Sequence, residues 1–242
     1  MRSFRVTLTP LSAFATPMKG DTLFGQLCWA VRNRLGETHL NACLEAYTQR
    51  RPFAVVSDAF PKGYLPLPKL PSGFYRPIEG EDRKAIKKRS WLPVHAIETP
   101  IEAWLEHAMT PATIAAGYAK GLSNLSEKHP QPHNTINRQT NTTGKDGFPP
   151  YSIEQEWFLP GLRWTVYLLL DSARLSADDC RQCLSDIGAI GFGRDASIGL
   201  GKFSIEAFDP VPLPTQKDGN ACLTLAPCAP QGLNFNAQNS FY

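Results

Sequence analysis

The stretch that organises the sequence reads Gly191-Phe192-Gly193-Arg194-Asp195-Ala196-Ser197-Ile198-Gly199-Leu200-Gly201-Lys202-Phe203. Its four glycines can adopt positive φ angles and let another backbone segment approach closely. Consecutive amides in such a loop can form a concave anion-binding site, and Arg194 and Lys202 add positive charge beside it. The pattern favours two interpretations equally: a loop that contacts phosphate groups, and a tight connection that needs glycine for its geometry alone.

The order of elements around this loop excludes the common nucleotide-binding folds. A helix is expected before the loop, and a strand over residues 202–208 is expected after it. A P-loop follows a strand, precedes a helix and has the order GxxxxGK[ST], and the GxGxxG turn of dinucleotide-binding folds also joins a strand to a helix. An anion at this loop would be a phosphate group, either alone or in a polynucleotide.

The composition describes a folded chain with nearly balanced charge. Of the 242 residues, 42% are hydrophobic and 19% are charged, as is typical of globular proteins. The formal net charge is only +3, so any nucleic-acid surface has to be a local patch. The densest group of cations lies in residues 83–89, which we interpret either as the solvated face of a helix or as a polyanion contact.

Both halves of the sequence show an order of strands and helices that fits a ferredoxin-like unit. In the first half, we expect strands at residues 2–8, 53–60 and 64–68, and helices at residues 20–36 and 37–50. In the second half, we expect a strand pair at 156–171, a helix at 177–188 and a strand at 202–208. The sequence therefore predicts an α+β fold with two ferredoxin-like (RRM-like) domains, a thumb-like arm and a glycine-rich loop.

The predicted domain boundaries follow from these elements. Residues 1–125 form the first ferredoxin-like domain together with the basic insertion, and residues 126–152 form the arm. Residues 153–242 form the second domain. The arm is rich in amides, hydroxyls and cations, with glycines near its tip, which indicates an exposed hairpin; a flexible surface loop is the alternative.

A second candidate anion site is the start of the first helix. Lys19 and Gly20 precede its free amide groups, and Asp21 or Thr22 can serve as the N-cap. Five aromatic rings could stack on bases: Phe4, Phe24, Tyr151, Phe192 and Phe203. Of these, we assign Phe4, Phe24 and Phe203 to the core.

The sequence contains no convincing catalytic or metal-binding constellation. A four-cysteine zinc site from Cys180, Cys183, Cys222 and Cys228 is weighed against buried apolar thiols, and the loose spacing of the second pair favours thiols. His133 is a candidate general base, or a residue that senses the 5′ end of an RNA. No secretory signal and no apolar run of 18 residues are visible, so we expect a cytoplasmic protein with free thiols, no metal and no cofactor.

Four motifs occur together in this order: Lys19-Gly20-Asp21-Thr22-Leu23-Phe24-Gly25, Val56-Ser57-Asp58-Ala59-Phe60-Pro61, Asn134-Thr135-Ile136-Asn137-Arg138, and the loop at 191–203. Through them, nearly the whole chain resembles the RAMP-superfamily CRISPR proteins. Within that superfamily it resembles subunit four of the type III-A (Csm) interference complex, the group that caps the 5′ end of the guide RNA. Members of this group usually continue beyond an aromatic segment like residues 240–242, so we expect one of two departures in the second domain: a shortened C-terminus or a missing last strand.

The resemblance implies a non-catalytic scaffold that binds the repeat-derived 5′ tag of the guide RNA. It also implies contacts with the large polymerase-like subunit and with a backbone RAMP subunit, and no membrane. The alternative within the same superfamily is a repeat-RNA processing endoribonuclease with His133 as its general base. Carried over to this sequence, the expected RNA contacts are Lys19, Gly20, His133, Asn134, Arg138, Thr140, Lys145, Gly191, Gly193, Arg194, Ser197 and Lys202.

Overall fold

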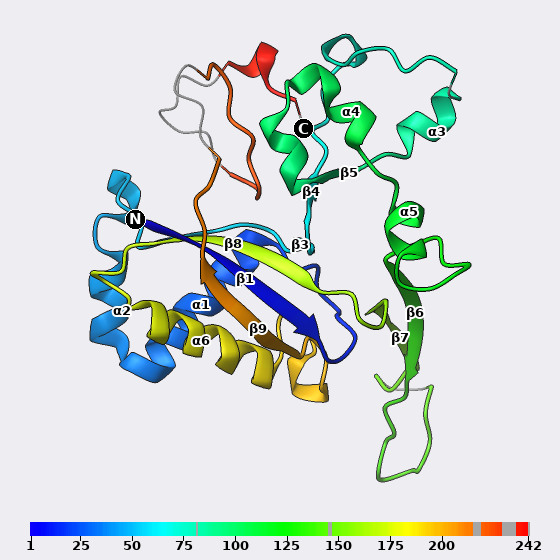
Figure 1. Cartoon of the computed structure of the whole chain (residues 1–242). Coiled ribbons are helices and arrows are strands. Elements are labelled where there is room, and N and C mark those ends of the chain that lie inside the picture. Colours follow the sequence, from blue (N-terminus) through cyan, green and yellow to red (C-terminus); the bar gives the residue numbers. More distant parts are fainter. Residues whose placement is uncertain (81, 145–146, 215–218, 229–235, 242) are drawn as a thin grey trace.

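A computed structural model describes residues 1–80, 82–144, 147–214, 219–228 and 236–241. Figure 1 shows a central sheet with helices on one face, a smaller region of short helices on the other side of the sheet, and a long hairpin that projects away from both. In the part of the chain that is described, no helix is long and apolar enough to cross a membrane.

The central sheet is antiparallel, with the strand order β2–β8–β1–β9 and with the short strand β3 also paired to β8. With helices α1 and α6, its chain order is β-α-β-β-α-β, which is that of a ferredoxin-like fold. The strands and the main helices are β1 (Arg2–Pro10), α1 (Gly20–Leu35), α2 (Glu37–Leu44), β2 (Ala54–Val56), β3 (Phe60–Pro61), β8 (Trp164–Leu170), α6 (Ala177–Ile190) and β9 (Phe203–Pro210).

This sheet corrects the predicted division into two ferredoxin-like domains. Strand β1 lies between β8 and β9, so that Val6 is opposite both Val166 and Phe208. The strands of the central sheet therefore come from both sequence halves and form one ferredoxin-like sheet, instead of one in residues 1–125 and another in 153–242. The physical reason is the shared core: the alternating apolar residues of β1 and the apolar run of β8 are buried against the same helices.

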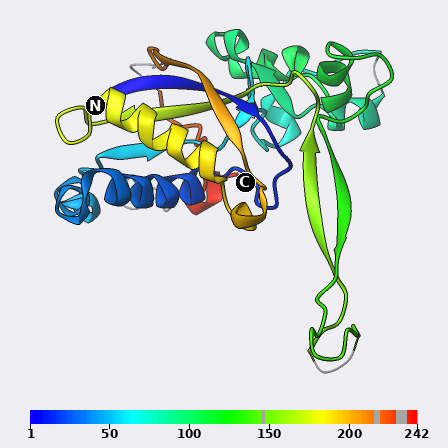
Figure 2. The same ribbon diagram turned by 90° about the horizontal axis from the view of Figure 1, so that it is seen from below.

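Helices α1, α2 and α6 cover one face of the sheet, as Figure 2 shows. Leu23, Leu27 and Val31 recur at helical spacing in α1 and are buried against the sheet. The Oγ of Ser176 accepts a hydrogen bond from the amide of Asp179, which confirms Ser176 as the N-cap of α6. The predicted helix at 37–50 is shorter than expected, because α2 ends at Leu44 and a 3₁₀ turn follows at Tyr47–Gln49.

Residues between β3 and the arm form a small subdomain with its own core around Leu92 and Trp104. The basic run lies here, partly in α3, whose N-cap Asp82 accepts a hydrogen bond from the amide of Lys84. Arg89 is structural, because its guanidinium donates to the carbonyl oxygens of Leu105 and Glu106. The elements are β4 (Tyr64–Pro66), α3 (Arg83–Lys87), β5 (Trp91–Pro93), α4 (Trp104–His107) and α5 (Pro111–Ala116).

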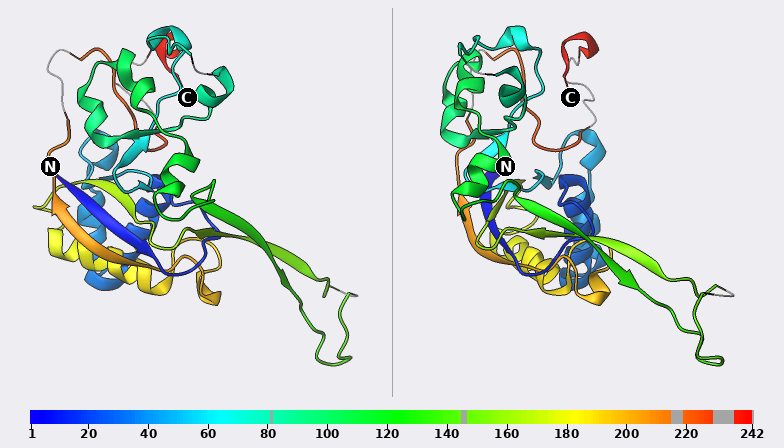
Figure 3. Two further views of the ribbon diagram at one scale, coloured as in Figure 1. Left: turned by 45° about the vertical axis from the view of Figure 1, so that its right-hand side comes forward. Right: turned by 90° about the vertical axis from the view of Figure 1, so that its right-hand side faces the viewer.

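The arm is a two-stranded antiparallel hairpin made of β6 (Ser126–His133) and β7 (Tyr151–Phe158). Figure 3 shows that it extends well beyond the sheet, with its tip far from the rest of the molecule. The expected exposed hairpin is therefore present. The expected strand pair at 156–171 is wrong, because β7 pairs with β6 whereas β8 joins the central sheet.

Candidate functional site

Residues 11–19, which we call the linking loop, connect β1 to α1 and contact two other segments of functional interest. The backbone of Phe14 exchanges two hydrogen bonds with Glu156 of β7, at 2.9 and 2.8 Å, which fixes the foot of the arm. The Oγ1 of Thr16 and the Oγ of Ser12 accept hydrogen bonds from the amides of Arg194 and Lys202, both at 2.9 Å. The linking loop therefore joins α1, the arm and residues 191–202, which we call the glycine loop.

The glycine loop needs glycine because its backbone is in close contact with other atoms. Gly191, Gly193, Gly199 and Gly201 all have φ between +73° and +122°. A Cβ on Gly201 would lie 2.1 Å from the carbonyl oxygen of Phe192, and one on Gly193 would lie 2.5 Å from the Cβ of Thr16. The interpretation of this stretch as a tight connection that needs glycine for its geometry is thus confirmed. It does not exclude the other interpretation, contact with phosphate groups.

Most of the loop's amides are used within the protein. Phe192 donates to Gly201, Gly201 donates to Ala13, and Leu200 donates to Asp195. The loop is therefore a rigid turn rather than an open ring of free amides. An anion would meet mainly its side chains, among which Arg194 and Ser197 are exposed and Lys202 is partly buried.

The charges around the loop are only partly compensated. The guanidinium Nε of Arg194 lies 3.0 Å from the carboxylate of Asp195. The ammonium of Lys202 has no ion-pair partner among the described residues. Since Arg194 is exposed and surface pairs of this kind are weak, both cations remain able to attract a phosphate.

The start of α1 is already capped from within the protein. Asp58 accepts a hydrogen bond from the amide of Gly20 at 2.8 Å, and its other oxygen lies 2.7 Å from the ammonium of Lys19. The expected side-chain caps Asp21 and Thr22 are wrong, because Lys19 occupies the N-cap position and its side chain does not cap the helix amides. Gly20 is buried, and a Cβ there would lie 2.4 Å from the carbonyl oxygen of Val56. The amide of Gly20 therefore has a structural role.

The tip of the arm carries hydrogen-bonding groups that are turned toward one another and toward solvent. Asn134 accepts from the hydroxyl of Thr143 at 2.5 Å, and the hydroxyls of Thr140 and Thr142 lie 2.8 Å apart. Arg138 is exposed. Lys145, another expected contact, lies outside the described residues. The tip is thus separated from the glycine loop by the length of the arm (Figure 3).

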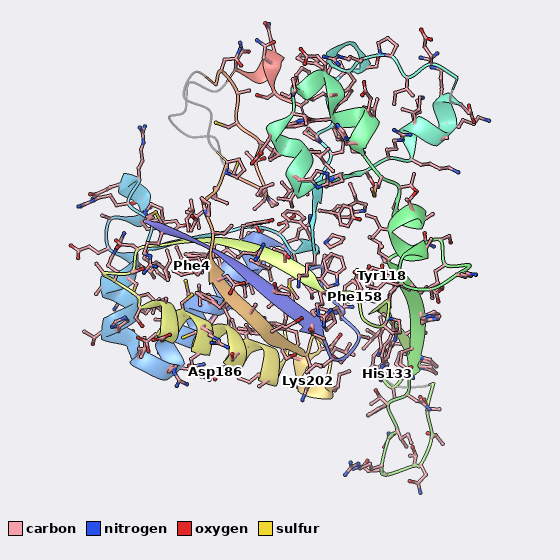
Figure 4. All side chains as sticks on the ribbon, viewed as in Figure 1. Phe4, Tyr118, His133, Phe158, Asp186 and Lys202 are labelled. Atoms are coloured by element: carbon pink, nitrogen blue, oxygen red, sulfur yellow. The ribbon has the colours of Figure 1, made fainter. Side chains whose placement is uncertain are left out.

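His133 ends β6, and its ring stacks on Tyr151 with the planes 13° apart and the centroids 5.3 Å apart. Its Nε2 is buried without a hydrogen-bond partner among the described residues. A general base has to reach the proton that it removes, so this placement suits a packing role better than catalysis. Figure 4 shows His133 partway along the arm, away from the central sheet and before the tip.

Of the rings considered for stacking on bases, only Tyr151 is well exposed, with 51% of its surface accessible. Phe4, Phe192 and Phe203 are fully buried in the core, and Phe24 is partly buried against Phe53. The assignment of Phe4, Phe24 and Phe203 to the core is confirmed, and Phe192 belongs with them.

The zinc interpretation has no support in the described residues. Cys180 and Cys183 are buried in the core, Cys222 and Cys228 are exposed in the C-terminal segment, and no cluster of three or more potential ligands is found there. Burial raises the pKa of the Cys180 thiol to about 12 and that of Cys183 to about 11. Both are therefore neutral thiols near pH 7.

Sequence reasoning missed three residues that position the site: Asp58, Ser12 and Thr16. Asp58 lies 38 residues from Gly20, whose amide it caps. The hydroxyls of Ser12 and Thr16 lie 190 and 178 residues from the amides that they bind. A short polar residue in a loop is common, so nothing local distinguished Ser12 or Thr16. Asp58 did stand within one of the four motifs, which was the one available signal.

The fold defined by this sheet, arm and glycine loop is that of proteins found in type III CRISPR effector complexes. Two structures of a Csm1–Csm4 cassette, one in complex with pppApA and one with AMPPNP, contain chains that match with TM-scores of 0.54 and 0.55. Both matches are 17% identical and cover 89% of this chain, and they cover 72% and 73% of the matched chains. A chain of a Csm3–Csm4 subcomplex of the type III-A interference complex matches with a TM-score of 0.51 at 15% identity, over 88% of this chain and 70% of its own.

At these identities the matches show a likeness of fold, and at that level they agree with the expected resemblance. No protein-family model matches the sequence, and no curated protein is found as a relative.

Proposed function

We propose that this protein is a non-catalytic scaffold subunit of a type III-A CRISPR interference complex. It binds the repeat-derived 5′ tag of the guide RNA and links the large polymerase-like subunit to the backbone subunits. The observation that carries the proposal is the likeness of the fold to chains of two assemblies, a Csm1–Csm4 cassette and a Csm3–Csm4 subcomplex.

The arrangement of cations supports RNA contact at two places. Arg194 and Lys202 stand on the rigid glycine loop, and Arg138 stands on the arm. A scaffold that holds a strand without cutting it needs rigid, positively charged supports but no general base. The packing of His133 on Tyr151 supports this interpretation over that of an endoribonuclease.

The experiment is to measure the affinity of the purified protein for guide RNA with its tag, with a scrambled tag and without a tag. We expect the tagged RNA to bind most tightly, and the affinity to fall as salt rises. Equal affinity for the three RNAs would contradict recognition of the tag.

The endoribonuclease alternative is tested separately with repeat RNA in the presence of a chelator. The scaffold proposal expects intact RNA after incubation. Cleavage by the wild-type protein that is lost in His133→Ala would overturn it, and Tyr151→Ala serves as the control for loss of the stacked pair without loss of the imidazole.

A further inference from the structure

The foot of the arm contains a preformed groove of about 130 Å³ between the end of β1 and the end of β7. It is lined by residues 9–12 and 157–162, and we call it the foot groove. The two hydrogen bonds between Phe14 and Glu156 hold its walls together. None of the expected RNA contacts lines this groove.

Two large apolar side chains on the rim of the foot groove are exposed to solvent. Leu11 has 63% of its surface accessible and Trp157 has 50%, whereas Leu159 and Leu162 form a buried floor. Exposed apolar rims that are continuous with a buried floor are typical of sites that receive a partner's side chain. A tryptophan in such a position is among the residues that contribute most to protein association.

The charges of the arm decide what kind of partner fits. Its two strands carry three carboxylates, Glu127, Glu154 and Glu156, and one ammonium, Lys128. Lys128 pairs with Glu154 at 2.8 Å, and Glu127 stands directly opposite Trp157 in the ladder. The carboxylate of Glu127 therefore lies at the border of the groove beside Trp157, where the described ion pairs give it one neighbour, the imidazole of His129 at 3.4 Å. A cationic side chain of a partner protein would be attracted to it.

We infer that the foot groove docks a basic segment of a neighbouring protein subunit, with one large apolar side chain in the groove and lysine or arginine beside Glu127. The inference rests on the proposed function, because it assigns the surface through which the scaffold joins its assembly. The main chain of Leu11 is bonded to the carbonyl oxygen of Lys202 at 2.8 Å. The foot groove therefore adjoins the glycine loop, and the two surfaces are joined by one rigid connection.

The test uses the full-length protein with each purified sister subunit, the large one and the backbone one, and with tagged guide RNA. The variants are Leu11→Ala and Trp157→Ala, and Trp29→Ala on α1 is the matched control, since Trp29 is also strongly exposed. We expect the affinity for at least one subunit to fall roughly tenfold or more in both variants, with RNA affinity and melting temperature unchanged. The control should bind as the wild type does.

Two results would overturn the inference. One is that the variants bind both subunits as tightly as the wild type does, and the other is that they lose affinity for RNA but not for a subunit. Glu127→Lys adds an independent measurement, because it should weaken subunit binding and reduce its salt dependence. If the wild-type protein binds neither subunit, the proposed function fails first. That outcome is distinguishable, because it appears before any variant is compared.

Discussion

The carboxylate of Asp58 caps helix α1 through the amide of Gly20, with 2.8 Å between Oδ1 and the amide nitrogen. The same side chain also holds the ammonium of Lys19 at 2.7 Å, and its own amide donates to the carbonyl oxygen of Leu225 in the C-terminal segment. One nearly buried aspartate therefore fixes the start of the helix, the preceding lysine and the segment that crosses over them.

Asp58→Ala should lower the free energy of unfolding by about 2 kcal/mol, because a helix loses its cap and a buried amide loses its acceptor. Asp58→Asn keeps an acceptor for Gly20 and loses the charge facing Lys19, so its loss should be smaller. Chemical denaturation measures both. Asp21→Ala is the control in the exposed first turn of the helix, and an equal loss there would argue against the special role of Asp58.

Gly201→Ala and Gly199→Ala separate the effect of crowding from the effect of backbone strain. Both residues have positive φ, +73° and +97°. A Cβ on Gly201 would lie 2.1 Å from the backbone of Phe192, whereas nothing lies within 4 Å of a Cβ on Gly199. Gly199→Ala should cost about 1 kcal/mol from strain, and Gly201→Ala should cost several times more or prevent folding. Similar melting temperatures for the two variants would contradict this account of the loop.

The sequence predicted the local elements well, because each depends on neighbours within a turn or two. Leu23, Leu27 and Val31 defined α1 by their spacing, and Ser176 marked the start of α6. The arm and the need for glycine in the loop were also predictable. The pairing of β1 with β8 and β9 was not, because partners such as Val6 and Val166 are 160 residues apart and many apolar strands would satisfy the same pattern.

The same limit applies to the site. The cations of the glycine loop could be identified from the sequence. The sequence did not predict that Ser12 and Thr16 accept hydrogen bonds from amides of that loop, or that Asp58 caps the start of α1. The foot groove was invisible for a similar reason. Leu11 and Trp157 line it together only because the linking loop meets β7, through Phe14 and Glu156.

Buried thiols should make the protein less stable in alkali. Burial raises the pKa of the Cys180 thiol from its ordinary 9.0 to about 12, so the folded state keeps this thiol neutral at a pH where the unfolded state ionises it. Stability is then full below pH 9 and falls between pH 9 and 12, by up to about 1.4 kcal/mol per pH unit for this thiol. Denaturation at pH 8, 9 and 10 measures the slope, which should be shallower in Cys180→Ala. An unchanged slope would show that other groups cause the loss.

Arg138→Ala and Lys202→Ala should each weaken binding of tagged RNA, because each removes a cation that faces no carboxylate among the described residues. For a single strand, loss of one phosphate contact should reduce the slope of log affinity against log salt by about 0.7. Arg181→Ala, on the exposed face of α6, is the matched control and should leave the slope unchanged. Because Arg138 and Lys202 lie on the arm and on the glycine loop, their effects should add in the double variant. Additive losses would mean that one RNA strand contacts both places, whereas a loss confined to one variant would restrict the RNA to that segment.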